Sequence, residues 1–120
     1  MSSLNTLIRG GGVWAGTLND TVQLTASAAG ANQGTATAIT KDITAFTTVA
    51  ASTGAILPKA TVPGESYLVA NLGANALALY PPVGHSINSG AANASVSVAA
   101  AKAARAVYCG SSKWLVIVGA

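Results

Sequence analysis

This chain contains few charged residues. They make up 8% of its 120 residues, whereas a typical soluble domain carries about 25%. A monomer relies on solvated charge to stay apart from its own copies. The six basic residues are also scattered along the sequence, and nucleic-acid binding needs a basic stripe with aromatic platforms. We therefore expect no nucleic-acid partner, and we expect other protein subunits to cover much of the surface.

Cysteine and histidine occur once each, which limits the sites that the chain could build. Cys109 cannot form an internal disulfide, so a disulfide-stapled scaffold is excluded. Its place at the end of a strand pattern predicts a buried, inert thiol. His85 follows Gly84 in a turn pattern and has no partner at metal-ligand spacing, so we predict a surface histidine that titrates near pH 6.5. The sequence predicts neither a metal site nor a cofactor.

Catalytic motifs are missing as well. The three carboxylates, Asp20, Asp42 and Glu65, all fall at predicted turns or strand ends. Two of them could meet as an acid–base pair, although solvated turn carboxylates are the favoured interpretation. No G-x-S-x-G elbow occurs for a nucleophilic serine, and the glycines at 10–12 lack the flanking strand and helix of a phosphate loop. We predict that the protein is not an enzyme.

Long apolar runs are also missing. No stretch approaches the roughly 18 apolar residues of a transmembrane helix. Arg9 follows the only short apolar stretch near the start, and the glycines at 10–12 interrupt what comes next, so we expect no signal peptide. The sequence predicts no membrane partner.

Short β-strand patterns make up most of the chain from Asp20 onward. Val22, Leu24 and Ala26 alternate with polar residues, which is the period-two pattern of a half-buried strand. Turn residues recur about every 8 to 12 positions, which predicts an all-β sandwich or barrel. The predicted strands lie at residues 21–27, 35–40, 43–50, 55–57, 67–72, 76–80, 86–88, 95–98, 105–109 and 114–118.

The alanine-rich run at residues 99–104 interrupts these strand patterns. Its helix propensity is the highest in the chain, yet isolated helices shorter than about 12 residues are marginal. Helix and turn therefore both stay open for this segment. Trp114 lies in an apolar strand pattern and is predicted to be part of the core, whereas Tyr67 and Tyr80 could be core edges or interface anchors.

Residues 1–19 differ from the strand region and form a predicted N-terminal arm, with the β-domain at residues 20–120. Three glycines at 10–12 predict a flexible hinge. A large aromatic residue this close to a terminus is seldom free in water, so Trp14 should fold back on its own domain or insert into a neighbour. The predicted partner contacts of the arm are Leu7, Ile8, Arg9, Val13 and Trp14.

Several motifs follow one another in the second half of the chain. Residues 71–81 read N-L-G-A-N-A-L-A-L-Y-P, residues 84–88 read G-H-S-I-N, and Trp114 lies in the closing strand. This series resembles a module of tailed-bacteriophage virion proteins, over roughly residues 20 to 118. The module is similar to capsid decoration (cement) proteins and to a related β-domain at the ends of some tail fibres. One departure is the A-A-A-K at residues 99–102, where the family often has a Pro-Ala-Gly-Lys turn.

The resemblance implies a small, often jelly-roll-like β-fold that assembles on the outside of a particle. It gives no active residues. We expect a structural virion protein that is made in the bacterial cytoplasm, binds the major capsid protein on the outer surface of the head and stabilises the shell. We expect a homo-oligomer, with a trimer favoured over a dimer. The alternative is a tail or tail-fibre β-domain that binds a host-surface glycan, and the aromatic content of 5% counts against such a binding site.

Overall fold

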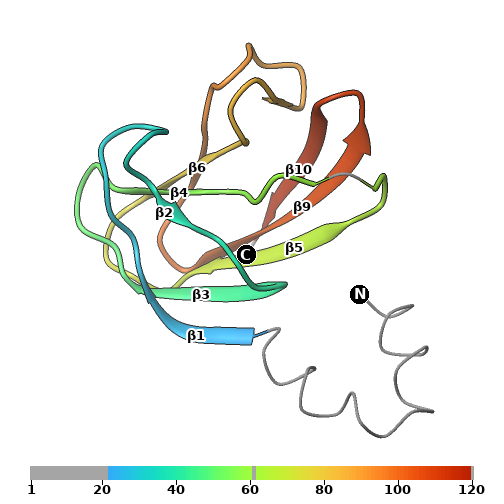
Figure 1. The fold of residues 1–120 in the computed structure, drawn as a ribbon. Coiled ribbons are helices and arrows are strands. Elements are labelled where there is room, and N and C mark those ends of the chain that lie inside the picture. The colour runs from blue at the N-terminus through green and yellow to red at the C-terminus, as the bar shows by residue number, and fades with distance from the viewer. Residues whose placement is uncertain (1–21, 61, 120) are drawn as a thin grey trace, which may run out of the picture.

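Ten β-strands build the part of the chain that the structure, a computed structural model, describes: residues 22–60 and 62–119 (Figure 1). No helix occurs among these residues, so the all-β prediction is confirmed. Each strand coincides with one of the ten predicted strand segments to within a few residues. The strands are β1 (Val22–Ser27), β2 (Thr37–Ala38), β3 (Ile43–Thr48), β4 (Gly54–Ile56), β5 (Ser66–Asn71), β6 (Leu77–Tyr80), β7 (Ser86–Ile87), β8 (Val96–Val98), β9 (Lys102–Gly110) and β10 (Lys113–Gly119).

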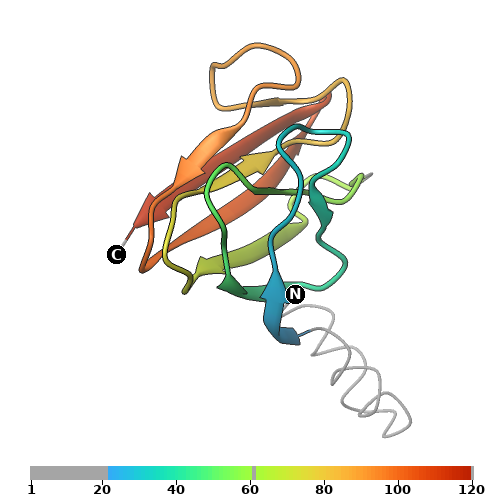
Figure 2. The same cartoon turned by 90° about the vertical axis from the view of Figure 1, so that its left-hand side faces the viewer.

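From β1 to β9 the strands alternate between two sheets as the chain advances, and β10 stays in the sheet of β9. The six-stranded sheet has the order β1-β3-β5-β9-β10-β7, and the four-stranded sheet has the order β2-β4-β6-β8. From β1 to β6, each strand therefore lies beside the strand two places earlier, and these neighbours run parallel. Figure 2 shows the chain crossing repeatedly between the sheets. The first six strands thus wind in the manner of a β-solenoid.

Antiparallel strands complete both sheets. β8 pairs with β6, β9 with β5, and β10 with β9, all antiparallel, while the short β7 adds a parallel edge to β10. A jelly roll is built from antiparallel strands, whereas five of the eight strand pairs described are parallel. The predicted jelly-roll order is therefore not confirmed. Strand patterns locate strands in a sequence, but they do not say which neighbour each strand will choose.

One hydrophobic core contains side chains from both sheets. Phe46, Val69 and Trp114 come from the six-stranded sheet, and Leu77 and Leu79 come from the four-stranded sheet. Trp114 is only 1% exposed, which confirms it as core. Six alanines of the described chain also belong to this core. Small side chains let the two sheets approach closely where large aromatic residues are scarce.

An asparagine, Asn71, links the two sheets at the start of the motif series. Its Nδ2 donates to the carbonyl oxygens of Asn75 and Val98, both at 2.8 Å, and its Oδ1 accepts from the Gly73 N–H at 3.0 Å. Asn71 ends β5 and Val98 ends β8, so one amide joins a strand of each sheet. A Cβ at Gly73 would lie 2.7 Å from atoms of Val49, so this position requires glycine.

Two further asparagines hold the turns that follow. Asn88 bonds Val116 in both directions, because its Nδ2 donates to the carbonyl at 3.2 Å and its Oδ1 accepts from the N–H at 2.9 Å. Asn93 Oδ1 accepts from the Gly84 N–H at 2.7 Å. Both asparagines have positive φ, 55° and 68°, a conformation that asparagine tolerates better than most residues. Asn71 and Asn88 of the motif series, and Asn93 after it, therefore have structural roles.

The segment at residues 99–104 is a turn followed by a strand, so its helical propensity is overridden. The Lys102 N–H donates to the carbonyl of Ala99 at 3.1 Å, and Ala101 has a φ of 65°. β9 then begins at Lys102, and it pairs with β5 on one side and β10 on the other. Ladder hydrogen bonds to two neighbours and the burial of Ala104 outweigh an intrinsic preference of a few tenths of a kcal/mol per residue.

Candidate functional site

The predicted arm lies outside the described residues. Its contacts Leu7, Ile8, Arg9, Val13 and Trp14 all fall in residues 1–21, which the structure does not describe. Binding of a neighbouring subunit by this arm stays a prediction. The candidate site is therefore built from residues 22–60 and 62–119.

Groups that could hold a metal ion are missing from the described residues. No three side chains of His, Cys, Asp or Glu come together there. None of the described residues belongs to a helix of the length and apolarity that a membrane crossing needs. Two arrangements of side chains remain as candidates: an aromatic and polar cluster on the inner side of the six-stranded sheet, and an aliphatic surface on its outer side.

His85 is buried, so the prediction of a surface histidine is wrong. Its side chain is 6% exposed, and its Nδ1 accepts a hydrogen bond from the Trp114 indole Nε1–H at 3.1 Å. It stacks on Tyr108 with the ring centroids 5.7 Å apart. Turn residues do surround it, but its ring lies inward against β9 and β10, which the turn pattern could not indicate. Burial lowers the pKa of His85, and the positive charge of Lys59 acts in the same direction.

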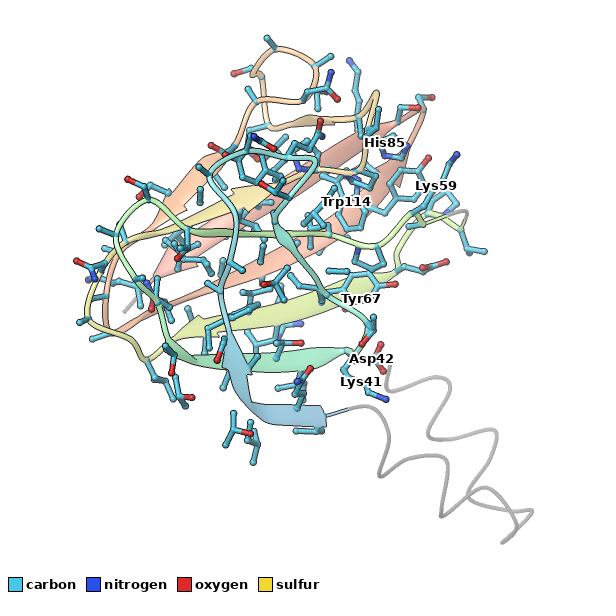
Figure 3. The ribbon with its side chains drawn as sticks, turned by 60° about the vertical axis from the view of Figure 1, so that its left-hand side comes forward. Lys41, Asp42, Lys59, Tyr67, His85 and Trp114 are labelled. Carbon is cyan, nitrogen blue, oxygen red and sulfur yellow. The ribbon has the colours of Figure 1, made fainter. Side chains whose placement is uncertain are left out.

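The aromatic rings continue from His85 along one side of the molecule. Tyr108 lies 5.3 Å from Trp114, and Trp114 lies 6.0 Å from Tyr67, centroid to centroid, in tilted arrangements. Figure 3 shows His85, Trp114 and Tyr67 following one another from the β7 turn toward the start of β5. Tilted pairs are favourable ring geometries. Tyr67 is partly buried against the core, so the core-edge alternative describes it.

Two carboxylates meet Tyr67 at the end of this aromatic row. The Tyr67 hydroxyl donates to Glu65 Oε2 at 3.1 Å, and Glu65 Oε1 accepts from the Val62 N–H at 3.2 Å. Burial raises the pKa of Tyr67 to about 12, helped by the hydrogen bond to Glu65 and by the negative charges of Glu65 and Asp42. Burial also raises the pKa of Asp42, with the Glu65 charge as a further cause. Figure 3 shows Asp42 beside Tyr67.

This cluster uses its polar groups within the fold. Glu65 binds a tyrosine hydroxyl and a backbone amide, and the His85 Nδ1 is occupied by the Trp114 indole. An acid–base pair needs carboxylates that are free to reach a substrate, and a nucleophile needs a base within hydrogen-bond reach. Among the described residues, Glu65 is committed to structural bonds, so the cluster is best explained as a stabilising network.

The second arrangement is the outer face, which we define as the surface of the six-stranded sheet directed away from the core. One row crosses five strands in register: Val22 on β1, Ile43 on β3, Leu68 on β5, Arg105 on β9 and Ile117 on β10. A second row pairs Ser66, Val107 and Leu115. Leu115 is 48% exposed and Ile117 is 64% exposed. Aliphatic side chains thus cover a sheet surface that nothing in the described chain packs against.

Cys109 lies next to the outer face, and the prediction of a buried thiol is wrong. The thiol is free and exposed. Ala106 and Tyr108 point inward along β9 and are buried. Cys109 lies at a register shift between β9 and β10, and its Sγ lies 3.6 Å from the carbonyl oxygen of Val107, a residue of the outer face. Cysteine prefers burial in general, but here the residue lies at the irregular end of β9 and its thiol is left exposed.

Sequence reasoning missed the outer face, although a signal was present. Residues 113–118 read K-W-L-V-I-V, in which both alternating sets of side chains are apolar. A strand that is apolar on both sides is typical of a strand covered on both faces. The structure places Trp114 and Val116 in the core, while Leu115 and Ile117 lie outside.

Comparisons with protein-family models, with curated proteins and with solved structures give no match for this chain. Its function must therefore be argued from its own surfaces.

Proposed function

We propose that this protein is a structural virion protein, a decoration protein that binds the outside of a phage head and stabilises the shell of the major capsid protein. The observation that supports this most directly is the exposed aliphatic outer face. Leu115 and Ile117 lie in the open on a regular sheet, and such patches mark interaction surfaces. The phage-virion resemblance, over roughly residues 20 to 118, supplies the kind of particle.

The architecture suits a passive, load-carrying role. Two mixed sheets around one core would give a rigid, sandwich-like body, and the asparagines of the motif series fix its turns. The described titratable groups form no metal cluster. A protein that binds only the assembled shell stabilises that shell by mass action, without any chemistry. In the proposed homo-oligomer, with a trimer favoured, several copies would bind one shell at once, which raises the overall affinity for the particle.

The alternative of a glycan-binding tail module has less support. Carbohydrate sites rely on exposed aromatic rings as platforms. Phe46, Tyr108 and Trp114 are buried, and Tyr67 and Tyr80 are half-buried, so no described aromatic side chain is exposed. This observation favours a protein partner.

The test is the place and number of copies in the virion. Heads and tails of the phage that encodes the chain would be separated by gradient sedimentation, and the chain would be counted in each by quantitative mass spectrometry. We expect many copies on DNA-filled heads. Heads from which the chain has been removed should release their DNA at a lower temperature than intact heads, and adding back purified chain should restore the release temperature. A few copies on tails would favour the alternative, and absence from both fractions would refute a virion role.

A further inference from the structure

We propose that the outer face binds a protein surface of aliphatic side chains that carries a carboxylate, and that Arg105 pairs with this carboxylate. This inference rests on the proposed function and names the docking surface for it. Three observations support this assignment: the face carries aliphatic side chains, a single guanidinium lies at its centre, and the two described carboxylates lie away from it.

Arg105 lies in the middle of the aliphatic rows. Its register partners are Leu68 on β5 and Ile117 on β10, and its neighbours two places along β9, Ala103 and Val107, face the same side. The Arg105 side chain is exposed. A partner that covers the aliphatic residues would therefore also cover the guanidinium.

The described carboxylates lie elsewhere. Glu65 bonds the Tyr67 hydroxyl and the Val62 N–H, on the side of the sheet where Tyr67 packs against Trp114. Asp42 lies beside Tyr67 (Figure 3), where burial, and then the charge of Glu65, raises its pKa. Within residues 22–60 and 62–119, therefore, Arg105 has no carboxylate on its own face, and a covering surface must supply one.

The charge of the face argues against a second copy as the occupant. Lys113 begins β10 on the same side as Leu115 and is exposed, so the described charges of the face are positive. Two outer faces packed against each other would bring guanidinium toward guanidinium. Covering a charge without a partner is strongly destabilising, whereas a bidentate Arg–carboxylate pair is among the strongest polar contacts. Self-association would therefore use another surface.

Binding to purified heads of the phage tests the assignment. Arg105→Glu should weaken binding about 30-fold or more. The substitution places a second carboxylate against the partner's carboxylate and leaves both without a positive partner in the covered interface. Arg105→Lys keeps the charge and should lose less. Lys59→Glu makes the same change of charge next to His85, away from the outer face, and should leave affinity within about 3-fold. Circular dichroism would verify that each variant is folded.

Cys109 provides a second readout. It is the single cysteine of the chain, and its exposed thiol lies 3.6 Å from the carbonyl oxygen of the outer-face residue Val107, so a maleimide should label it quickly in free protein and slowly on heads. Equal labelling in both states, or Arg105→Glu binding like the unaltered chain, would overturn the inference while the proposed function stands. Labelling that slows with protein concentration alone would assign the face to a second copy. Binding to vesicles of anionic phosphatidylglycerol would assign it to a membrane, and unaltered chain that binds no heads would refute both proposals.

Discussion

The two sides of the six-stranded sheet differ sharply in how their side chains are used. On the inner side, Trp114 packs among aromatic rings and donates to His85 at 3.1 Å. On the outer side, the next residue of the same strand, Leu115, is half exposed with no described neighbour above it. Stability therefore comes from the inner side, and the outer side is free for binding. Substitutions on the inner side should therefore lower the free energy of unfolding strongly, whereas substitutions on the outer side should change it little and affect binding instead.

The largest contrast is expected between neighbouring residues of β10. Trp114→Ala removes a buried ring and leaves the His85 Nδ1 without its donor, which should lower the free energy of unfolding by about 3–5 kcal/mol. Leu115→Ala should change it by less than about 1 kcal/mol, because the side chain is half exposed. Urea denaturation followed by circular dichroism measures both, because Trp114→Ala removes the core fluorophore. Similar losses for the two variants would contradict the division between the sides.

A smaller contrast is expected at the end of β5. Asn71→Ala removes an amide that makes three hydrogen bonds to Asn75, Val98 and Gly73. The buried groups left unpaired should lower the free energy of unfolding by about 2–3 kcal/mol. Ala70→Ser alters the adjacent outward position and should cost less than about 1 kcal/mol. Both values come from urea denaturation, and an Asn71→Ala variant as stable as Ala70→Ser would show that the asparagine does not link the sheets.

The smallest effect concerns pH and His85. Because burial holds its pKa in the folded protein below that of the unfolded chain, the unfolded state binds more protons once the pH falls below about 6.5. Protonation of Nδ1 would also break the bond from the Trp114 indole. Stability should therefore be constant above pH 6.5 and decline from there toward pH 5.5.

His85→Gln is the matched control for this pH dependence. A glutamine amide oxygen can still accept from the indole, but it does not titrate. Urea midpoints measured between pH 7.5 and 5.5 should flatten in this variant. An equally steep decline in the variant would assign the pH dependence to another group.

Much of the fold could be predicted from the sequence, because strands and turns are local features. The alternation at Val22–Ala26 and the turn glycines located the strands, and the apolar run around Trp114 located the core. The parallel pairing of β1, β3 and β5 was out of reach, since neighbours are chosen by packing across the whole molecule. Helix propensity at residues 99–104 did not predict the observed turn and strand for the same reason. The conformation of that segment is set by the pairing of β9 with β5 and β10.

The candidate site was harder to predict. His85 and Cys109 were both assigned to the wrong environment, since a turn or strand end does not say which way one side chain points. Their positions depend on the register of β9 and on the ring of Trp114. The doubly apolar pattern of residues 113–118 was the one local sign of the outer face.

The pairing of β5 with β9 also has a consequence for how the chain is made. β5 ends at Asn71, yet its neighbour in the sheet begins at Lys102, so translation at about 5–20 residues per second leaves the β5 edge open for a few seconds. An open strand edge is a template for association with other chains. Nascent copies on one messenger are therefore most exposed to mispairing in that interval, which ends when the β9–β10 hairpin pairs with the open edge of β5.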